Sequence, residues 1–299
     1  MPLYMCFGLA LRSPIPLPLR PSPADLPADA VITLLPPAEQ QEPGPFLSFS
    51  EDCGLTQIVM CPPGVGTFTV SRGKEISFQS DTSEHDSALL ELFFTGSILS
   101  LLLYQRGLLV LHGSAVRMQR TTVAFVGHSG AGKSSAVAAC CRQGHTLLAD
   151  DSTAIAFSAG RPLVQPGFPR IKVHEQTAEA LGLAIGSLSA VHPDIDDEFA
   201  YPLNHQFCTG AMPLGVVYLL GEGERVEFEE LSPGTALVEL LQHAQPSRHG
   251  HSGGAHQFEQ LAALVRQVPV FRLLRPRDFG LLHQLPQVIG NHLIAQGIS

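Results

Sequence analysis

A short stretch in the middle of the chain has the spacing of a phosphate-binding loop. Residues 127–134 read GHSGAGKS, which matches G-x-x-x-x-G-K-[ST]. The glycines allow backbone conformations that turn several N–H groups toward one anion, and a helix starting near Lys133 would add its positive end. Lys133 is expected to reach the β- and γ-phosphates, and the Ser134 hydroxyl to ligate Mg²⁺. The pattern predicts ATP and Mg²⁺ as cofactors, with nucleotide contacts from Gly127, His128, Ser129, Gly130, Ala131, Gly132, Lys133, Ser134 and Ser135.

Two adjacent carboxylates downstream could serve the metal and the acceptor. Asp150 and Asp151 end the apolar segment HTLLADD, 145–151. If this segment is a strand that follows the loop's own helix, its end returns to the phosphate side of the sheet. Adjacent side chains on an extended strand point to opposite sides, so one carboxylate could face Mg²⁺ and the other an incoming hydroxyl. A solvated Asp-Asp turn is the alternative reading.

A histidine lies fifteen residues before the loop. His112 ends the apolar stretch LLVLH, and the strand TTVAFVG (121–127) follows shortly after it. If the two strands are neighbours, His112 lies near the γ-phosphate. Spacing alone favours the alternative, a structural histidine.

Basic residues further along the chain are candidate substrate contacts. Arg170 and Lys172 are two apart in PRIKV, so on a strand they face the same way and could hold a phosphate or a carboxylate. Arg275, in RLLRPRD, is a third candidate. Ordinary surface positions are the competing interpretation. The histidine-rich stretch 243–256 is predicted to be a mobile loop that could close over a peptide rather than a metal site; its histidines are His243, His249, His251 and His256.

Composition excludes several classes of partner. The chain has 299 residues, a net charge of −9 and lysine only at 74, 133 and 172, so nucleic acid and anionic lipid are not expected partners. The six cysteines lack a metal-ligand spacing and are read as free thiols in a reducing compartment. The N-terminus does not have the pattern of a secretory signal, and the apolar runs fall short of the roughly 20 residues that span a bilayer. The prediction is a cytoplasmic protein without a membrane segment.

The order of elements predicts two domains. Short strand candidates separated by proline- and glycine-rich turns make 1–84 a β-rich accessory domain, expected to position the substrate. In 85–299, strands and helices are mixed without regular βαβ alternation. The fold class expected there is α/β, with a mixed sheet flanked by helices around the phosphate loop.

Three motifs together resemble the catalytic domain of HPr kinase/phosphorylase. They are LHGSAV, GHSGAGKSS and GHTLLADD, in the same order and at the same spacing as in that family, and the match is strong over 105–160. Weaker similarity links the chain to a bacterial group of HPr-kinase-like proteins, some of which phosphorylate the C-terminal serine of lasso-peptide precursors. The segments that carry it are FGLALRSPIPLP (7–18), PGFPRIKV (166–173) and VFRLLRPRD (270–278).

The resemblance implies a fold, a reaction and a set of roles. The fold is an HPr kinase/PEP carboxykinase-like core, and the reaction is ATP- and Mg²⁺-dependent transfer of the γ-phosphoryl group to a serine of a peptide or protein. By position, Asp150 is the candidate base, Asp151 a metal ligand with Ser134, and His112 lies beside the γ-phosphate with Lys133.

Some features of that family are missing. The glutamate-bearing segment after the Asp pair and the basic substrate loop have no recognisable counterpart, so HPr as substrate and the reverse reaction do not transfer. A homo-oligomer is left open. A small-molecule kinase and a regulatory nucleotide-binding ATPase without a peptide acceptor remain as alternatives.

Overall fold

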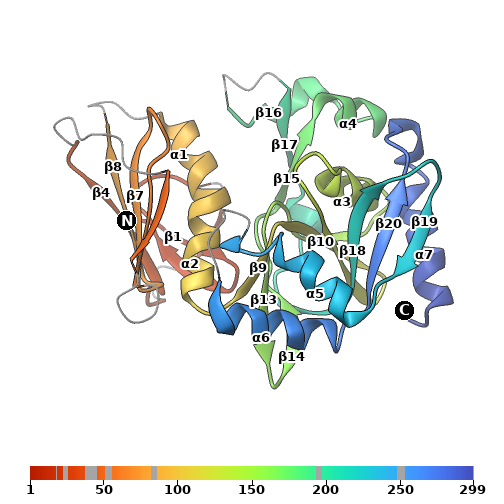
Figure 1. Cartoon of the computed structure of the whole chain (residues 1–299). Coiled ribbons are helices and arrows are strands. Elements are labelled where there is room, and N and C mark those ends of the chain that lie inside the picture. Colours follow the sequence, from red (N-terminus) through yellow and green to blue (C-terminus); the bar gives the residue numbers. More distant parts are fainter. Residues whose placement is uncertain are drawn as a thin grey trace. The chain divides into compact units, whose positions relative to one another are not determined.

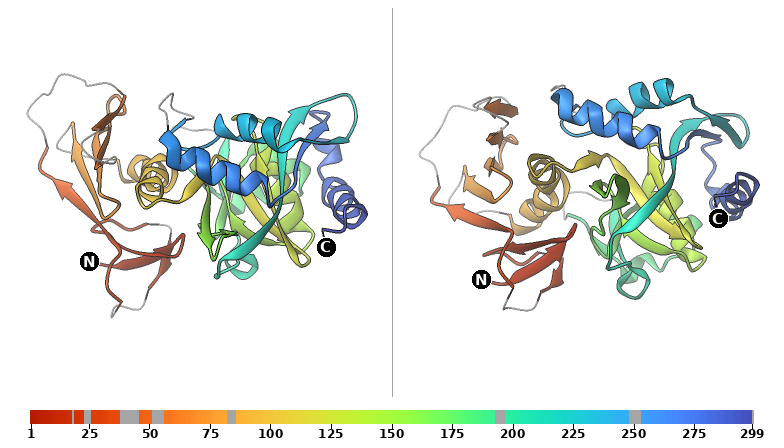
Figure 2. Two further views of the ribbon diagram at one scale, coloured as in Figure 1. Left: turned by 60° about the horizontal axis from the view of Figure 1, so that its bottom comes forward. Right: turned by 90° about the horizontal axis from the view of Figure 1, so that it is seen from below.

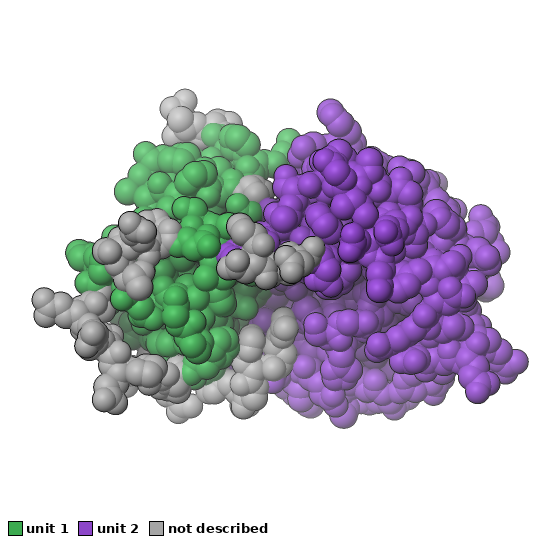
Figure 3. Space-filling view, turned by 90° about the horizontal axis from the view of Figure 1, so that it is seen from above, with its two compact units in different colours: residues 1–108 green, residues 109–299 purple. Residues whose placement is uncertain are grey.

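The computed structural model of the chain describes residues 1–17, 19–22, 26–37, 46–50, 56–81, 86–192, 197–247 and 253–298. The chain forms two compact units, Met1–Leu108 and Leu109–Ser299 (Figure 3). Helices and mixed sheets occur together along the chain, which confirms the predicted mixed α/β class.

Unit 1 contains an eight-stranded sheet with the order β3-β1-β2-β4-β8-β7-β6-β5 (Figure 1). Its strands alternate buried and partly exposed positions, as in β7, where Phe68 and Val70 point into the core. The strand bounds are β1 Leu3–Cys6, β2 Leu9–Arg12, β3 Arg20–Pro21, β4 Ala30–Leu35, β5 Leu47–Ser50, β6 Gln57–Met60, β7 Gly66–Ser71 and β8 Glu75–Ser80.

A long apolar helical segment packs on this sheet and belongs to unit 1. It comprises α1 (Ser87–Phe93), a π-helical turn (Phe94–Ile98) and α2 (Leu99–Gln105). The Phe94 ring meets Phe68 edge-on at 5.4 Å between centroids. The two compact units divide after Leu108, whereas the domain boundary was expected after residue 84. The residue pattern changes from strand to helix near residue 85, but this marks only a change of element. The helix buries its apolar surface within unit 1 and therefore belongs to that unit.

The same segment corrects the expectation about apolar runs. Ser87–Gln105 spans 19 residues with a mean hydropathy of 1.7, so by length and composition it could cross a membrane. Its apolar window is 61% buried inside the protein, which is the environment of a core helix.

Unit 2 contains a nine-stranded mixed sheet. The order is β12-β10-β11-β18-β14-β13-β9, with β20 paired to β18 and β19 paired to β20. The bounds are β9 Leu109–Leu111, β10 Gly113–Met118, β11 Thr121–Val126, β12 Thr146–Ala149, β13 Thr153–Ser158, β14 Arg161–Val164, β18 Met212–Glu222, β19 Glu227–Glu230 and β20 Val270–Arg275.

The strand directions bring several chain segments to one edge of this sheet. β10 runs antiparallel to both β11 and β12, with Gly113 opposite Val126 and Ala115 opposite Ala149. β18 runs parallel to β11 and to β20. The C-terminal ends of β11, β12, β18 and β20 and the start of β10 therefore meet at the same edge, which is where ligands bind in many open α/β sheets.

Helices and a small second sheet complete unit 2. The α3 helix packs with its buried alanines and cysteines into the main core, close to α7, while α5 and α6 lie side by side (Figure 2). The helices are α3 Lys133–Arg142, α4 Glu175–Ala180, α5 Pro233–Leu241, α6 Gly254–Val265 and α7 Leu285–Ala295, with 3₁₀ turns at Ile185–Ser187, Asn204–Gln206 and Phe279–Leu281. The small sheet has the order β15-β17-β16, comprising β15 Arg170–His174, β17 Glu198–Pro202 and β16 Ser189–Ala190.

The histidine-rich stretch is partly regular, in contrast to the predicted mobile loop. His243 is buried, and its neighbour Ala244 forms a β-bridge with Leu111. His256 lies in α6, while His249 and His251 are outside the described residues. The described part of 243–256 is attached to β9 and α6 because its backbone finds hydrogen-bond partners there.

Candidate active site

The glycine-rich loop joins β11 to α3 at this edge of the sheet. Gly130 and Gly132 have φ of 78° and 86°, a region that favours glycine. The Lys133 side chain is buried, and its Nζ donates hydrogen bonds to the carbonyls of Gly127 at 2.9 Å and His128 at 2.8 Å. The loop and its lysine therefore form a compact cationic turn at the N-terminal end of α3.

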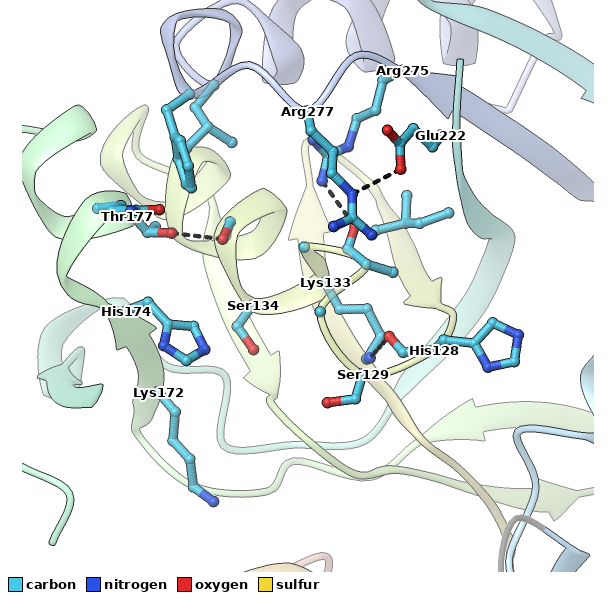
Figure 4. Close-up of a pocket in the computed structure, with 18 of the residues that line it drawn as sticks. His128, Ser129, Lys133, Ser134, Lys172, His174, Thr177, Glu222, Arg275 and Arg277 are labelled. Carbon is cyan, nitrogen blue, oxygen red and sulfur yellow. Dashed lines mark hydrogen bonds and ion pairs between the residues drawn. The ribbon is translucent and has the colours of Figure 1, made fainter. Parts of the chain in front are cut away.

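A pocket of about 800 Å³ opens over the loop. It is lined by all the loop residues from His128 to Ser135, and by residues from β15, α4 and the ends of β18 and β20. Lys172 and His174 lie on one side of the loop, and Arg275, Arg277 and Glu222 on another (Figure 4). Glu222 and Arg275 end β18 and β20 at this edge of the main sheet, whereas Lys172 and His174 come from β15 of the small sheet.

Asp150 is buried beneath the pocket and bonded to three donors. Its Oδ1 accepts from the hydroxyls of Ser134 at 2.8 Å and Ser114 at 2.6 Å, and its Oδ2 accepts from the Lys172 N–H at 2.9 Å. Burial raises the pKa of Asp150, whereas the three hydrogen bonds oppose that rise and Asp151 adds to it. This carboxylate therefore orients the serine hydroxyl that the sequence predicts as a Mg²⁺ ligand.

Asp151 faces the pocket instead. It has a φ of 66°, so the chain leaves the extended conformation and the expectation of two side chains on opposite faces of a strand is wrong here. The strand itself, β12, ends at Ala149. The Asp151 side chain is 32% exposed, and its oxygens lie 3.4 Å from Nδ1 of His112 and 3.6 Å from Nζ of Lys172.

His112 lies at a break between two strands. The predicted strand over 108–116 is divided into β9 and β10, and His112 occupies the junction. Its Nδ1 is 3.0 Å from the carbonyl oxygen of Asp151, which can only accept, so Nδ1 carries the hydrogen. Its Nε2 is buried without a hydrogen-bond partner among the described residues. The expected adjacency to the loop's strand is present, because β10 pairs with β11.

Two of the three basic residues predicted to contact the substrate line the pocket. Lys172 and Arg275 line the pocket, but Arg170 is not among its lining residues in the part of the chain that the structure describes. Arg272, a neighbour of Arg275 in the sequence, pairs with Glu229 and Glu239 instead. Arg170 was expected to face the same way as Lys172 on β15, but the described pocket lining on this strand comprises Lys172 and His174.

Several pocket contacts were not predicted from the sequence. The hydroxyls of Ser135 and Thr177 are 2.8 Å apart and join α3 to the start of α4. Arg277 and Glu222 form an ion pair at 2.9 Å on the rim. Ser114 could have been found from the sequence, because it follows His112 by two residues. Thr177 and Glu222 could not, because tertiary packing brings them to the loop.

The residues present fit a nucleotide-bound Mg²⁺. Among the described residues, no group of three or more His, Cys, Asp or Glu side chains forms a metal site. Mg²⁺ in nucleotide sites usually has one or two protein ligands and takes the rest from phosphates and water. The Ser134 hydroxyl bonded to Asp150 meets that requirement.

Gly132→Ala should weaken nucleotide binding. Gly132 has a positive φ, and a Cβ added there would lie 2.1 Å from Nη2 of Arg275. Both the strain and the displaced guanidinium would distort the loop. Calorimetric titration with ADP should show at least about a 10-fold rise in Kd, which corresponds to about 1.4 kcal/mol. Gly144→Ala is a matched control for the strain alone, because Gly144 also has a positive φ but no atom near its Cβ. Wild-type affinity in Gly132→Ala would contradict this view of the loop.

Comparisons with known proteins give a limited result. No protein-family model and no curated protein matches the chain. A solved structure, the HPr(Ser) kinase/phosphatase from Coxiella burnetii, is similar with a TM-score of 0.36 and 11% identity, covering 63% of this chain and 98% of that one. Similarity at this level does not place the chain in a family.

Proposed function

We propose that the chain is an ATP- and Mg²⁺-dependent kinase that transfers the γ-phosphoryl group to a serine hydroxyl of a peptide or protein. The observation that carries this is a pocket over the phosphate loop, with one carboxylate facing the open space and a second, buried carboxylate beneath it that is bonded to the loop serine. The resemblance of the three sequence motifs to HPr kinase/phosphorylase supports the same reaction.

The two carboxylates would divide the work in the reverse of the order expected from the sequence. Asp150 bonds Ser134, so this pair would hold Mg²⁺ beside the phosphates. Bound Mg²⁺ would supply charge neutralisation of the β- and γ-phosphates. Asp151 faces the pocket and would accept the proton of the serine hydroxyl.

His112 and Lys172 would prepare Asp151 for that role. Both lie within 4 Å of its carboxylate oxygens, at 3.4 Å and 3.6 Å, and so would hold the carboxylate in position at the pocket. Lys133 would neutralise charge on the transferred group from within the loop. Phosphoryl transfer needs little covalent chemistry from the protein, so positioning and charge would supply most of the rate.

Unit 1 is the proposed substrate-positioning unit, and the described residues that line the pocket belong to unit 2. The C-terminal serine of a lasso-peptide precursor is one candidate acceptor. A cytoplasmic location and a homo-oligomer are parts of the same proposal.

ADP release with and without acceptors tests this proposal. Mg-ATP turnover should be slow alone and rise with a serine-bearing peptide from a mixed panel. Stimulation by a metabolite and not by any peptide would favour a small-molecule kinase. Turnover that no acceptor changes would favour a regulatory ATPase.

A further inference from the structure

Arg275 lies against the phosphate loop at the end of β20. It is opposite Glu222 in the parallel pair β18–β20, at the edge where the loop lies. Its Nη2 donates to the carbonyl of Ala131 at 2.9 Å. The guanidinium also fills the space beside Gly132 that a Cβ would otherwise occupy. It contacts the C-terminal half of the loop, whereas Lys133 bonds carbonyls in its first half (Figure 4).

The positive charge of Arg275 is poorly compensated. Its Nε is buried without a hydrogen-bond partner, and no carboxylate among the described residues forms an ion pair with it. The nearby Arg277 is paired with Glu222, so that carboxylate is already engaged. Burial and Arg277 both lower the pKa of Arg275. A partly buried cation with one carbonyl partner is destabilising to the folded protein unless an anion joins it.

The surroundings select the kind of anion. The loop amides, the N-terminal end of α3 and Lys133 already form a phosphate site, and Arg275 extends it along Ala131 and Gly132. Arginine matches phosphate geometry well because its guanidinium donates in parallel pairs. Lys133 and Arg275 bond carbonyls of different loop residues, so a phosphate chain lying along the loop can meet both cations.

We propose that Arg275 binds the phosphate chain of the nucleotide as a second cation, and is not a contact for the phosphoacceptor. This inference rests on the proposed function, because it concerns the donor side of the same pocket. It changes the assignment suggested by the sequence, which grouped Arg275 with Lys172 as substrate contacts. In the pocket the two residues lie on different sides of the loop.

Arg275→Met tests the proposal without any acceptor. Calorimetric titration with Mg-ADP should show a Kd raised about 10- to 100-fold, the loss expected for charge-assisted hydrogen bonds to phosphate. Thermal unfolding without nucleotide should show unchanged or raised stability, because an uncompensated charge has been removed. Arg225→Met is the matched control, since Arg225 has an 84% exposed side chain and does not line the pocket.

The two readouts separate this role from a purely structural one. If Arg275 only holds the loop, Arg275→Met should lower the unfolding temperature while the folded variant keeps its ADP affinity, and the proposal fails. Wild-type affinity for ADP together with unchanged stability also overturns it. If the wild type binds neither ADP nor pyrophosphate, the proposed function itself fails and this inference falls with it.

Discussion

Asp151→Asn should lower phosphoryl transfer about 10²- to 10⁴-fold and leave ADP affinity within about 3-fold of wild type. The substitution keeps the size of the side chain but removes the group that can accept a proton. Asp151 is partly exposed, and the loop serine is bonded to Asp150, so loss of the Asp151 charge should not disturb nucleotide binding. Single-turnover transfer and calorimetric ADP binding measure the two quantities separately.

Asp150→Asn is the matched comparison. Asp150 is buried and accepts three hydrogen bonds on two oxygens, so an amide there would replace one acceptor by a donor facing either the Lys172 N–H or the two serine hydroxyls. Loss of thermal stability and a raised Mg²⁺ requirement are expected together with loss of activity. Asp150 would be the base if the results were reversed. In that case Asp151→Asn would retain full transfer, and Asp150→Asn would be stable and bind ADP but be inactive.

Lys133→Ala should raise the Kd for Mg-ATP about 10²-fold and make transfer undetectable. The Lys133 ammonium is held at the loop by two carbonyls, where it can pair with the phosphates of a bound nucleotide. Charge-assisted contacts of this kind are stronger than neutral hydrogen bonds. Equilibrium binding of a fluorescent ATP analogue and the transfer assay give the two values.

The chain provides a natural control for this substitution. Lysine occurs only at 74, 133 and 172, and Lys74 is exposed in unit 1. Lys74→Ala removes the same charge and should leave the Kd for Mg-ATP unchanged. Equal losses in both variants would point to a general charge effect and against a specific role for the loop lysine.

Local sequence signals predicted the loop and its flanking elements. The apolar strand before Gly127 and the helix that begins near Lys133 follow from the local pattern of residues. The pairing of the strand after His112 with the loop's strand was also predictable from their proximity in sequence. These features depend on residues close together in the chain.

Features decided by long-range packing were not predictable. The left-handed conformation of Asp151 is held by contacts with His112 and Lys172, which lie 39 and 21 positions away along the chain. The helical segment 87–105 was expected with the second domain, whereas it packs on a sheet made by earlier strands. The position of Arg275 against Gly132 depends on a parallel strand pair that local pattern does not reveal.

Intact-mass analysis of a serine-bearing peptide panel, incubated with Mg-ATP, tests the central claim most directly. Wild-type protein should add about 80 Da, one phosphoryl group, to at least one peptide, and Asp151→Asn should not. A panel that includes serine-ending peptides addresses the proposed acceptor class. ATP consumption by the wild type with every peptide at its original mass would contradict a peptide or protein kinase built on this pocket.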